Sequence, residues 1–401
     1  MRTFLFVLLS CALTLSGCGG GGQGPGLPRL LVEPDDGRGP ILEAIAAATD
    51  NIRLTIYEIT DLQAVVQTPP APAAGVAQAL IDKARRGVTV RVIVDQYEYQ
   101  SGSSAIAIQQ TVAALRDAGV TVNLSSTAFC YTHQKTFVID GPTAANPGLR
   151  GTAIIMSLNL MPGYFGGTRD YAVVTTDPAV VQEASRVFDA DFVLANPRSA
   201  CWAAHTPAAT YPPPYPSDTP PVSEASLLWS PVNSKPKLLQ LIGSVKQSLV
   251  LTTEELGDNA MVCAIQAVAQ SPSRPSVRIL LSGDTGSNGS AVTTLLGLGL
   301  PNLSIRIMPG QPTSPGNPPV PTPLYMHGKQ AIADGAQGFV GSENLTNTSL
   351  IQNRELGTLF TDPGMIARLE AVFTADFSTP GSSLPASPCP GCQPIACPAA
   401  P

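Results

Sequence analysis

Several kinds of residue are scarce in this chain of 401 amino acids, which has only 3 histidines, 13% charged residues and 5% aromatic residues. So few histidines exclude a histidine-rich metal site. The chain has 23 Lys and Arg against 29 Asp and Glu, a net charge of -6, so it lacks the basic excess of proteins that grip long stretches of nucleic-acid backbone. Its 44% of hydrophobic residues can bury a core, which excludes disorder along the whole length.

The apolar run near the start, from Phe4 to Leu15, is too short to span a bilayer. With Arg2 before it, the run predicts a secretion signal over residues 1–17. The signal ends in Leu15-Ser16-Gly17-Cys18, which resembles the lipobox of bacterial lipoproteins, and a Gly-rich tether over 18–28 follows. We therefore expect a lipid on Cys18 that anchors the protein in the cell envelope, at the outer membrane or the extracellular face. The alternative is an ordinary cleaved signal with Cys18 as a bystander.

The other cysteines indicate disulfide chemistry. Apart from Cys11 in the signal and Cys18, they are Cys130, Cys201, Cys263, Cys389, Cys392 and Cys397. Disulfides persist in the compartment that a secretion signal implies. The last three form C-x2-C-x4-C in a Pro-rich tail, and three thiols without a histidine make a poor zinc site. We expect a disulfide in the tail, with zinc ligation as the alternative, and the connectivity stays open.

The chain contains an internal repeat. Residues 30–61 predict a strand, a helix and a strand (LLVEP, ILEAIAAATDNI, LTIYEITD), and residues 227–258 repeat this order (LLWSP, LLQLIGSVKQS, LVLTTEELGD). In both copies an amphipathic helix follows, over 75–86 and 259–270, and then a β-rich run, VTVRVIVD or SVRILLSG. Strands that alternate with helices in this way predict an α/β fold of two similar lobes with covered sheets.

Proline-rich stretches mark the boundaries of the repeat. We assign a first lobe to residues 29–204 and a second lobe to 223–379. The segment between them, 205–222, is too rich in proline for a helix or strand and predicts a linker, in which His205 is expected to be solvent-exposed without a function. Residues 380–401, rich in Pro and Cys, form an extended tail.

Each half carries the same polar residues in the same frame, and the two frames take up two of the three histidines. The first frame consists of His133, Lys135, Asp140, Ser157, Asn159 and Asp170, and the second of His327, Lys329, Asp334, Ser342, Asn344 and Glu355. Lys follows His by two residues and Asp follows it by seven in both, while the last acid follows Asn by 11 in both. Only the spacing from Asp to Ser differs, because of a turn-like insertion around Pro142 to Arg150. Lysine occurs only six times in the chain, so the agreement indicates duplication of an element that one half cannot use alone.

These residue types suit phosphoryl transfer. Lys, Asn and Ser side chains are compact donors that can hold the non-bridging oxygens of a phosphoryl group and its developing charge. Histidine can be a nucleophile or a proton carrier near neutral pH, so two histidines can divide the work: one attacks phosphorus and the other protonates the leaving oxygen. Asp170 and Glu355 are expected to accept a hydrogen bond from the far ring nitrogen of a histidine and so fix its tautomer. Because the donors supply the positive field, we expect no metal and no other cofactor.

With these residues the chain resembles the phospholipase D superfamily, whose signature is H-x-K-x4-D-x6-G-S-x-N. The second frame matches every fixed position, including Gly341, whereas the first has Met156 in place of the glycine. The resemblance covers about residues 30–377. It implies two α/β/α sandwich lobes around a pseudo-twofold central active-site cleft and a phosphohistidine intermediate formed without a metal.

The resemblance also implies individual roles. Asp140 and Asp334 are expected to be structural, His133 to attack phosphorus and His327 to carry out the acid/base work. Because both motifs lie in one chain, we expect a monomer.

Five further side chains are candidates for the cleft. They are Glu58, Glu254 and Glu255 at equivalent strand ends, and Tyr131 and Tyr325 beside the histidines. The glutamates either reach the cleft or stay outside it, and the tyrosines either line it or pack in the core. Arg53 and the pair Arg85-Arg86 are expected to be solvated surface charges.

The signature specifies a phosphodiester bond and leaves the molecule open. A lipid anchor would place the cleft beside phospholipid at high effective concentration, and an acidic chain disfavours tight non-specific binding of nucleic acid. Both favour a phospholipase D-type phosphodiesterase or transphosphatidylase that acts on phospholipid. The alternatives are a secreted nuclease that cleaves DNA or RNA, and an inactive binding or structural lipoprotein of the envelope.

Overall fold

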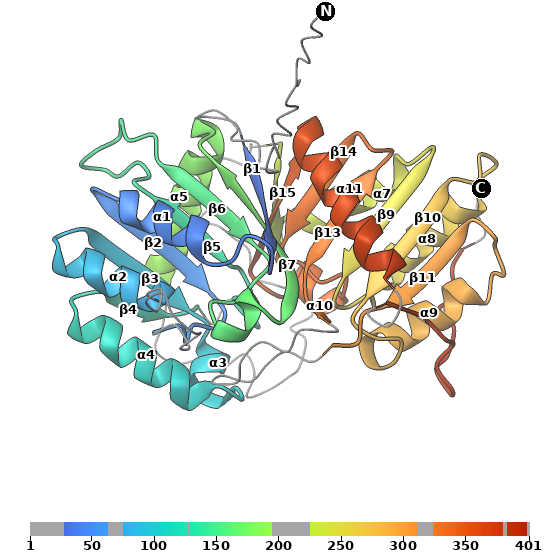
Figure 1. Cartoon of the computed structure of the whole chain (residues 1–401), viewed down its shortest axis with the longest axis horizontal. Coiled ribbons are helices and arrows are strands. Elements are labelled where there is room, and N and C mark those ends of the chain that lie inside the picture. Colours follow the sequence, from blue (N-terminus) through green and yellow to red (C-terminus); the bar gives the residue numbers. More distant parts are fainter. Residues whose placement is uncertain are drawn as a thin grey trace, which may run out of the picture.

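The computed structural model describes residues 28–62, 75–126, 129–194, 225–310, 324–379 and 383–398. Within them the chain forms two α/β lobes that lie side by side, the first half in blue to green and the second in yellow to red (Figure 1). The expected fold class and the duplication are thereby confirmed. The signal, Cys18, nearly all of the tether, His205 and the linker 205–222 lie outside the described residues.

In its described part, the first half forms a mixed sheet of seven strands. In their order across the sheet these are β1 (Arg29–Glu33), β7 (Thr168–Thr175), β6 (Thr152–Met156), β5 (Thr136–Ile139), β2 (Asn51–Ile56), β3 (Thr89–Val94) and β4 (Thr121–Leu124). The neighbours from β2 to β4 pair in parallel and those from β1 to β2 antiparallel. β2 and β5 are buried throughout, as in a sheet that is covered on both faces.

The second half repeats this sheet strand for strand. In the same order its strands are β8 (Leu227–Ser230), β15 (Glu355–Phe360), β14 (Gln337–Gly341), β13 (Lys329–Ala333), β9 (Ser248–Thr253), β10 (Ser276–Leu281) and β11 (Leu303–Ile307). Two short strands depart from the repeat. β16 (Leu384–Pro385) pairs with β11, and β12 (Tyr325–Met326) crosses to the first lobe and pairs with β7.

Helices cover both faces of each sheet. Those described are α1 (Gly39–Ala47), α2 (Val76–Arg85), α3 (Gln96–Ser101), α4 (Ala105–Asp117), α5 (Pro178–Leu194), α7 (Ser234–Gly243), α8 (Asn259–Gln270), α9 (Gly289–Leu296), α10 (Asn347–Ile351) and α11 (Pro363–Ser378), with short 3-10 turns η1 (Pro162–Phe165) and η2 (Gly286–Asn288). The helices α1, α2 and α4 enclose one core with the first sheet, and α7, α8 and α9 enclose the corresponding core with the second. The amphipathic spacing of α8 predicted its bounds correctly, and the Asp258 carboxylate caps it by accepting the Met261 N–H.

The first helix of each repeat ends several residues earlier than its apolar pattern predicted. The reason is the aspartate of each frame. Asp140 accepts the backbone N–H groups of Thr49, Asp50 and Asn51 at 2.7 to 3.1 Å, which forms a turn after α1 and starts β2. Asp334 does the same for residues 246–248 before β9. Burial opposes the charge of both carboxylates, but these backbone hydrogen bonds bring each pKa below its ordinary value. Both aspartates are structural, as expected.

The long helices α5 and α11 join the lobes. α5 packs on its own sheet and also on Trp229 and Leu356 of the second lobe, while α11 shares a core with β1 and β7 of the first. Two buried arginines form matching ion pairs between the lobes. Arg169 donates to both carboxylate oxygens of Asp376 on α11 at 2.7 and 3.0 Å, and Arg354 donates to both of Asp191 on α5 at the same distances.

We expect Arg354→Ala to lower the free energy of unfolding by about 3–5 kcal/mol, because Asp191 would remain buried without its partner. Urea denaturation measures the loss. The matched control is Arg278→Ala, whose pair with Glu370 leaves the two side chains 28% and 43% exposed; it should cost at most about 1 kcal/mol. Equal losses of unfolding free energy in the two variants would contradict a strong stabilising ion pair between the lobes.

The expectation that Arg53 is a solvated surface charge is wrong. Arg53 is 1% exposed, because it lies on the central strand β2 beneath α5. Its guanidinium donates to Asp189 at 3.1 and 3.2 Å and to the Pro142 carbonyl at 2.8 Å. The insertion in the first frame therefore supplies a carbonyl that helps to satisfy a buried charge.

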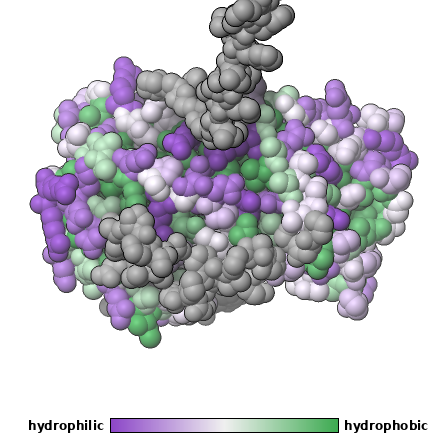
Figure 2. Space-filling view, viewed as in Figure 1, coloured by the Kyte–Doolittle hydropathy of each residue, from purple (hydrophilic) through white to green (hydrophobic). Residues whose placement is uncertain are grey.

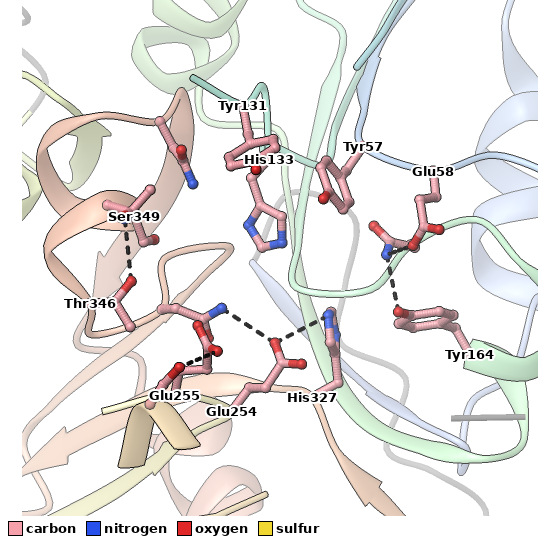
Figure 3. A pocket seen from close by; sticks show the side chains of 15 residues that line it. Tyr57, Glu58, Tyr131, His133, Tyr164, Glu254, Glu255, His327, Thr346 and Ser349 are labelled. Carbon is pink, nitrogen blue, oxygen red and sulfur yellow. Dashed lines mark hydrogen bonds and ion pairs between the residues drawn. The ribbon is translucent and has the colours of Figure 1, made fainter. Parts of the chain in front are cut away.

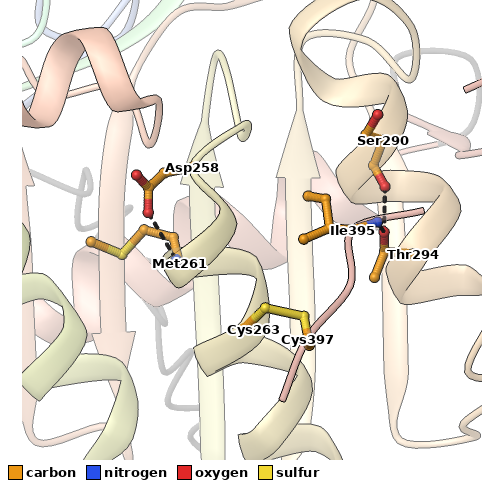
Figure 4. Close-up of a disulfide and its surroundings, with 7 residues drawn as sticks. All are labelled: Asp258, Met261, Cys263, Ser290, Thr294, Ile395 and Cys397. Atoms are coloured by element: carbon orange, nitrogen blue, oxygen red, sulfur yellow. Dashed lines mark hydrogen bonds between the residues drawn. A yellow bond between two sulfur atoms is a disulfide. The ribbon is translucent and has the colours of Figure 1, made fainter. Parts of the chain in front are cut away.

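Disulfides fix the tail to the second lobe. Cys263 on α8 pairs with Cys397, and Cys389 pairs with Cys392. Figure 4 shows the first of these bonds between α8 and the tail, close to Ile395, whose N–H donates to Thr294 Oγ1 on α9 (2.7 Å). The expected tail disulfide is confirmed, and its cysteines are not zinc ligands.

Hydrophilic and hydrophobic residues are interspersed over both lobes on the face shown in Figure 2. None of the helices in the described ranges combines the length and the apolar content that a membrane span requires.

Candidate active site between the lobes

The histidines of the two frames line one cavity of about 430 Å³. His133 lies in the segment between β4 and β5, and His327 lies between β12 and β13. Figure 3 shows both rings directed into the same space. The structure therefore brings together two residues that are 194 positions apart in the sequence.

Each histidine is positioned by backbone of the opposite lobe. The strand before His327, β12, pairs with β7, and the His327 N–H donates to the Arg169 carbonyl at 3.3 Å. Reciprocally, Thr132 forms a bridge with Arg354, and the Gln134 N–H donates to the Arg354 carbonyl at 2.9 Å. Neither histidine would hold this position in an isolated lobe.

The acids of the two frames also pair across the lobes. His133 Nδ1 lies 2.9 Å from Glu355 Oε2, and His327 Nδ1 lies 2.8 Å from Asp170 Oδ1. Both carboxylates are 0% exposed. A carboxylate that accepts the Nδ1–H fixes the tautomer and turns Nε2 toward the cavity.

The surroundings of the two rings differ. Burial lowers the pKa of His133 to about 4, helped by the positive charges of Lys135 and Lys329 and opposed by Glu355. Because His133 is then neutral at pH 7, its Nε2 lone pair is available as a nucleophile. His327 has a carboxylate at each ring nitrogen, since its Nε2 lies 3.6 Å from Glu254 Oε2. This distance is that of an ion pair and is too long for a hydrogen bond, and it places a negative charge beside the His327 ring that His133 does not have at its Nε2.

Burial by itself would raise the pKa of Asp170 and of Glu355. The histidine partner and a nearby lysine outweigh burial in each case, so both pKa values lie below the ordinary range. Both groups are therefore carboxylates at neutral pH and can accept the Nδ1–H of their histidines.

The lysines of the two frames lie just behind the histidines. Lys135 and Lys329 are 0% and 1% exposed, and the Nζ of each donates to the carbonyl of the histidine two residues before it. Burial lowers the pKa of Lys135 to about 7. The Nζ of Lys329 also donates to Glu254 Oε2 at 3.0 Å.

The asparagines and serines of the frames lie in different places. Asn159 and Asn344 line the cavity, and their amides donate to Glu58 (2.7 Å) and Glu254 (3.3 Å). Ser157 and Ser342 are 0% exposed. The Ser157 hydroxyl donates to Asp170 at 2.6 Å, and the Ser342 oxygen accepts the Leu356 N–H at 3.1 Å. The serines therefore position Asp170 and β15, instead of facing the cavity as phosphate donors.

Of the side chains left open by the sequence, Glu58, Glu254, Glu255 and Tyr131 line the cavity. Burial, together with the charge of Glu98, raises the pKa of Glu58 to about 7. Tyr325 donates its hydroxyl to Glu254 Oε1 at 2.6 Å.

Two cavity tyrosines were missed. Tyr57 and Tyr164 lie edge-on to His133 and His327, with ring centroids 4.7 and 4.9 Å apart. Tyr57 directly precedes Glu58, so alignment of the two copies beyond the strand ends would have found it. No comparable signal marked Tyr164.

In the part of the chain that the structure describes, no group of three or more His, Cys, Asp or Glu side chains is arranged to hold a metal ion.

A family model described as the PLD-like domain of cardiolipin synthase matches residues 41–192 and 238–377. The phosphatidylserine synthase of Haemophilus influenzae resembles the chain with 14% identity and a TM-score of 0.56, over 89% of this chain and 87% of that one. The polyphosphate kinase of Porphyromonas gingivalis gives the same identity and TM-score over 90% of this chain and 48% of the kinase, so the chain spans about half of the kinase. At 14% identity both likenesses show the fold alone. No curated protein matches the sequence.

Proposed function

This chain belongs to the phospholipase D superfamily, and from that premise we propose that it is a metal-independent phosphodiesterase that hydrolyses or transfers phosphatidyl groups. The observation that carries the proposal is the pair of histidines that face one cavity, each held at Nδ1 by a carboxylate of the other lobe. This arrangement directs Nε2 of both rings into the cavity, where the two atoms can act on a single phosphorus atom.

The two steps follow from the two ring environments. His133 Nε2 attacks phosphorus, the P–N bond forms, and the P–O bond to the leaving group breaks. His327 gives its Nε2 proton to the leaving oxygen. Water or an alcohol then gives a proton to His327 and attacks phosphorus, so that the P–N bond breaks and His133 is restored.

Positive charge next to the cavity is expected to stabilise both transition states. Lys135, Lys329, Asn159 and Asn344 are the donors available to the non-bridging oxygens. Because Lys135 and Lys329 lie behind the rings, we expect their ammonium groups to act on the phosphoryl group over a short range in a low-dielectric site.

We propose phospholipid as the substrate and a lipid on Cys18 as the anchor that holds the protein at the cell envelope, at the outer membrane or the extracellular face. Support comes from the lipobox-like sequence before Cys18 and from the acidic net charge of -6. An anchored cleft meets phospholipid at high effective concentration. Since both histidines come from one chain, a monomer would contain the complete site.

A turnover panel tests this proposal. The purified full-length protein, in EDTA, is offered mixed phospholipid vesicles with and without an added alcohol, and separately single-stranded DNA. We expect headgroup release from the vesicles, and transfer to the alcohol if the protein is a transphosphatidylase. His327→Asn should abolish both, because the leaving oxygen of a lipid headgroup needs a proton.

The other outcomes select the alternatives. If DNA is cleaved while the vesicles stay intact, the protein is a nuclease and the proposal of a phospholipid substrate is wrong. Turnover of neither would favour a binding or structural protein, and lipid turnover that persists in His327→Asn would overturn the mechanism.

A further inference from the structure

A carboxylate lies among the donors that the second frame would offer to a phosphoryl group. Glu254 Oε2 lies 3.0 Å from Lys329 Nζ, 3.3 Å from Asn344 Nδ2 and 3.6 Å from His327 Nε2. These three groups are the His, Lys and Asn of one motif. Figure 3 shows the Glu254 carboxylate directed toward the ring of His327. Its oxygen therefore holds a position that suits a non-bridging oxygen of a substrate.

The first frame also has a carboxylate beside its asparagine, since Glu58 accepts the Asn159 amide at 2.7 Å, but Glu58 aligns with Glu255 and not with Glu254. Leu256 forms a bridge with Leu345 just as Ile59 does with Leu160, which aligns Glu254 with Tyr57 of the first copy. The Lys135 Nζ lies 5.0 Å from the centre of the Tyr57 ring, where Lys329 has an ion pair. The two halves of the pseudo-symmetric site are thus electrostatically different.

Glu254 is held in place as an anion. Burial alone would raise its pKa, but Lys329, His327 and the Tyr325 hydroxyl outweigh burial and bring the pKa well below the ordinary range. Tyr325 donates to the other oxygen, Oε1, at 2.6 Å. The carboxylate is therefore both ionised and anchored at two points.

We propose that Glu254 is a built-in competitor for the phosphoryl group, whose carboxylate occupies the oxygen site between His327, Lys329 and Asn344 until a substrate displaces it. The inference rests on the proposed function of the same site. A small anion must replace the contacts of Glu254 and also accept repulsion from it. A phosphodiester with a large attached group gains further binding energy elsewhere and can meet that cost. Glu254 thus makes the cavity selective against free phosphate and in favour of large phosphodiesters.

Removal of the charge tests the proposal through the binding of inorganic phosphate to the full-length protein, measured by calorimetry. Glu254→Gln keeps the shape of the side chain, and we expect phosphate to bind at least about tenfold more tightly, equal to about 1.4 kcal/mol. With a phosphodiester substrate, KM should fall more than kcat changes. A side chain that only maintains the local structure would not strengthen the binding of an anion.

Glu255→Gln is the matched control. Glu255 lines the same cavity, but its carboxylate accepts from the Ser287 hydroxyl at 2.9 Å, and burial and the Glu254 charge affect its pKa more than Lys329 and His327 do. The variant also replaces a cavity carboxylate by an amide, so it measures how the loss of a negative charge elsewhere in the cavity affects phosphate binding. We expect a change in phosphate affinity of less than about threefold, as for a screened charge outside the donor set.

Tyr325→Phe provides a second, independent variant. It removes the hydrogen bond that anchors Glu254 Oε1 and leaves the charge and the three donors intact, so phosphate should bind about threefold more tightly. Unchanged or weaker binding of phosphate in Glu254→Gln overturns the proposal. If that variant does not fold, the same result in Tyr325→Phe overturns it.

These measurements need no turnover, so they separate the inference from the proposed function. If no diester is turned over but phosphate binds more tightly to Glu254→Gln, the proposed role of Glu254 is supported and the proposed enzymatic function is contradicted. If lipid is turned over but the phosphate affinity of Glu254→Gln equals that of the native protein, the proposed function is supported and the proposed role of Glu254 is contradicted.

Discussion

Replacement of His133 by asparagine is expected to lower turnover at least about 10,000-fold, because His133 is the group assigned to form the covalent intermediate. The basis is the neutral ring of His133, whose pKa is lowered to about 4 by burial, and the 2.9 Å contact between its Nδ1 and Glu355. Asparagine retains a polar side chain of similar reach but has no nucleophilic nitrogen.

The matched variant His327→Asn distinguishes the two roles. A substrate with a nitrophenolate leaving group departs without a proton, so His327→Asn should still release one equivalent of nitrophenolate. The second step then stalls because water is not deprotonated. Intact-protein mass spectrometry should detect a phosphoryl adduct in His327→Asn and none in His133→Asn. An adduct in His133→Asn alone would exchange the roles.

The frames and the fold could be predicted from the sequence because both depend on local regularities. The spacing from His133 to Lys135 and from His327 to Lys329 places each pair around the start of a strand, with both side chains on one face. Apolar periodicity identified three strands and two helices in each half. The predicted helix after β1 is too long because nothing local shows that the Asp140 carboxylate, 90 residues away from Asp50, binds the N–H groups of the turn that ends the helix.

The contacts between the lobes could not be read from either half alone. Asp170 and Glu355 were expected to orient a histidine, but which histidine each one binds depends on how the two sheets meet. The direction of the Ser157 and Ser342 hydroxyls could not be predicted either, since a hydroxyl in a motif can face the phosphate or a neighbouring strand. One available signal was overlooked: Asp191 follows Asp170 by 21 residues, as Asp376 follows Glu355, and both aspartates bind an arginine of the opposite lobe.

The second large effect concerns the acid that serves His133 from the other lobe. Glu355→Gln is expected to slow adduct formation by about 1,000-fold or more. The glutamine amide can donate to Nδ1, which would place the ring proton on Nε2 and remove the nucleophilic lone pair. Single-turnover release of nitrophenolate measures this step. Asp170→Asn, which changes the partner of His327, should slow the breakdown of the adduct far more than its formation.

The dependence of adduct formation on pH separates this effect from a loss of structure. In the native protein the rate should rise as the pH passes through about 4, where His133 becomes neutral. The negative charge of Glu355 raises the pKa of His133 against the effects of burial and of the two lysines. Its removal must therefore move the acid limb of the profile to lower pH while the plateau falls. A partly unfolded variant would show the opposite shift, toward the ordinary histidine pKa of about 6.5, and that result would contradict the pairing of His133 with Glu355 across the lobes.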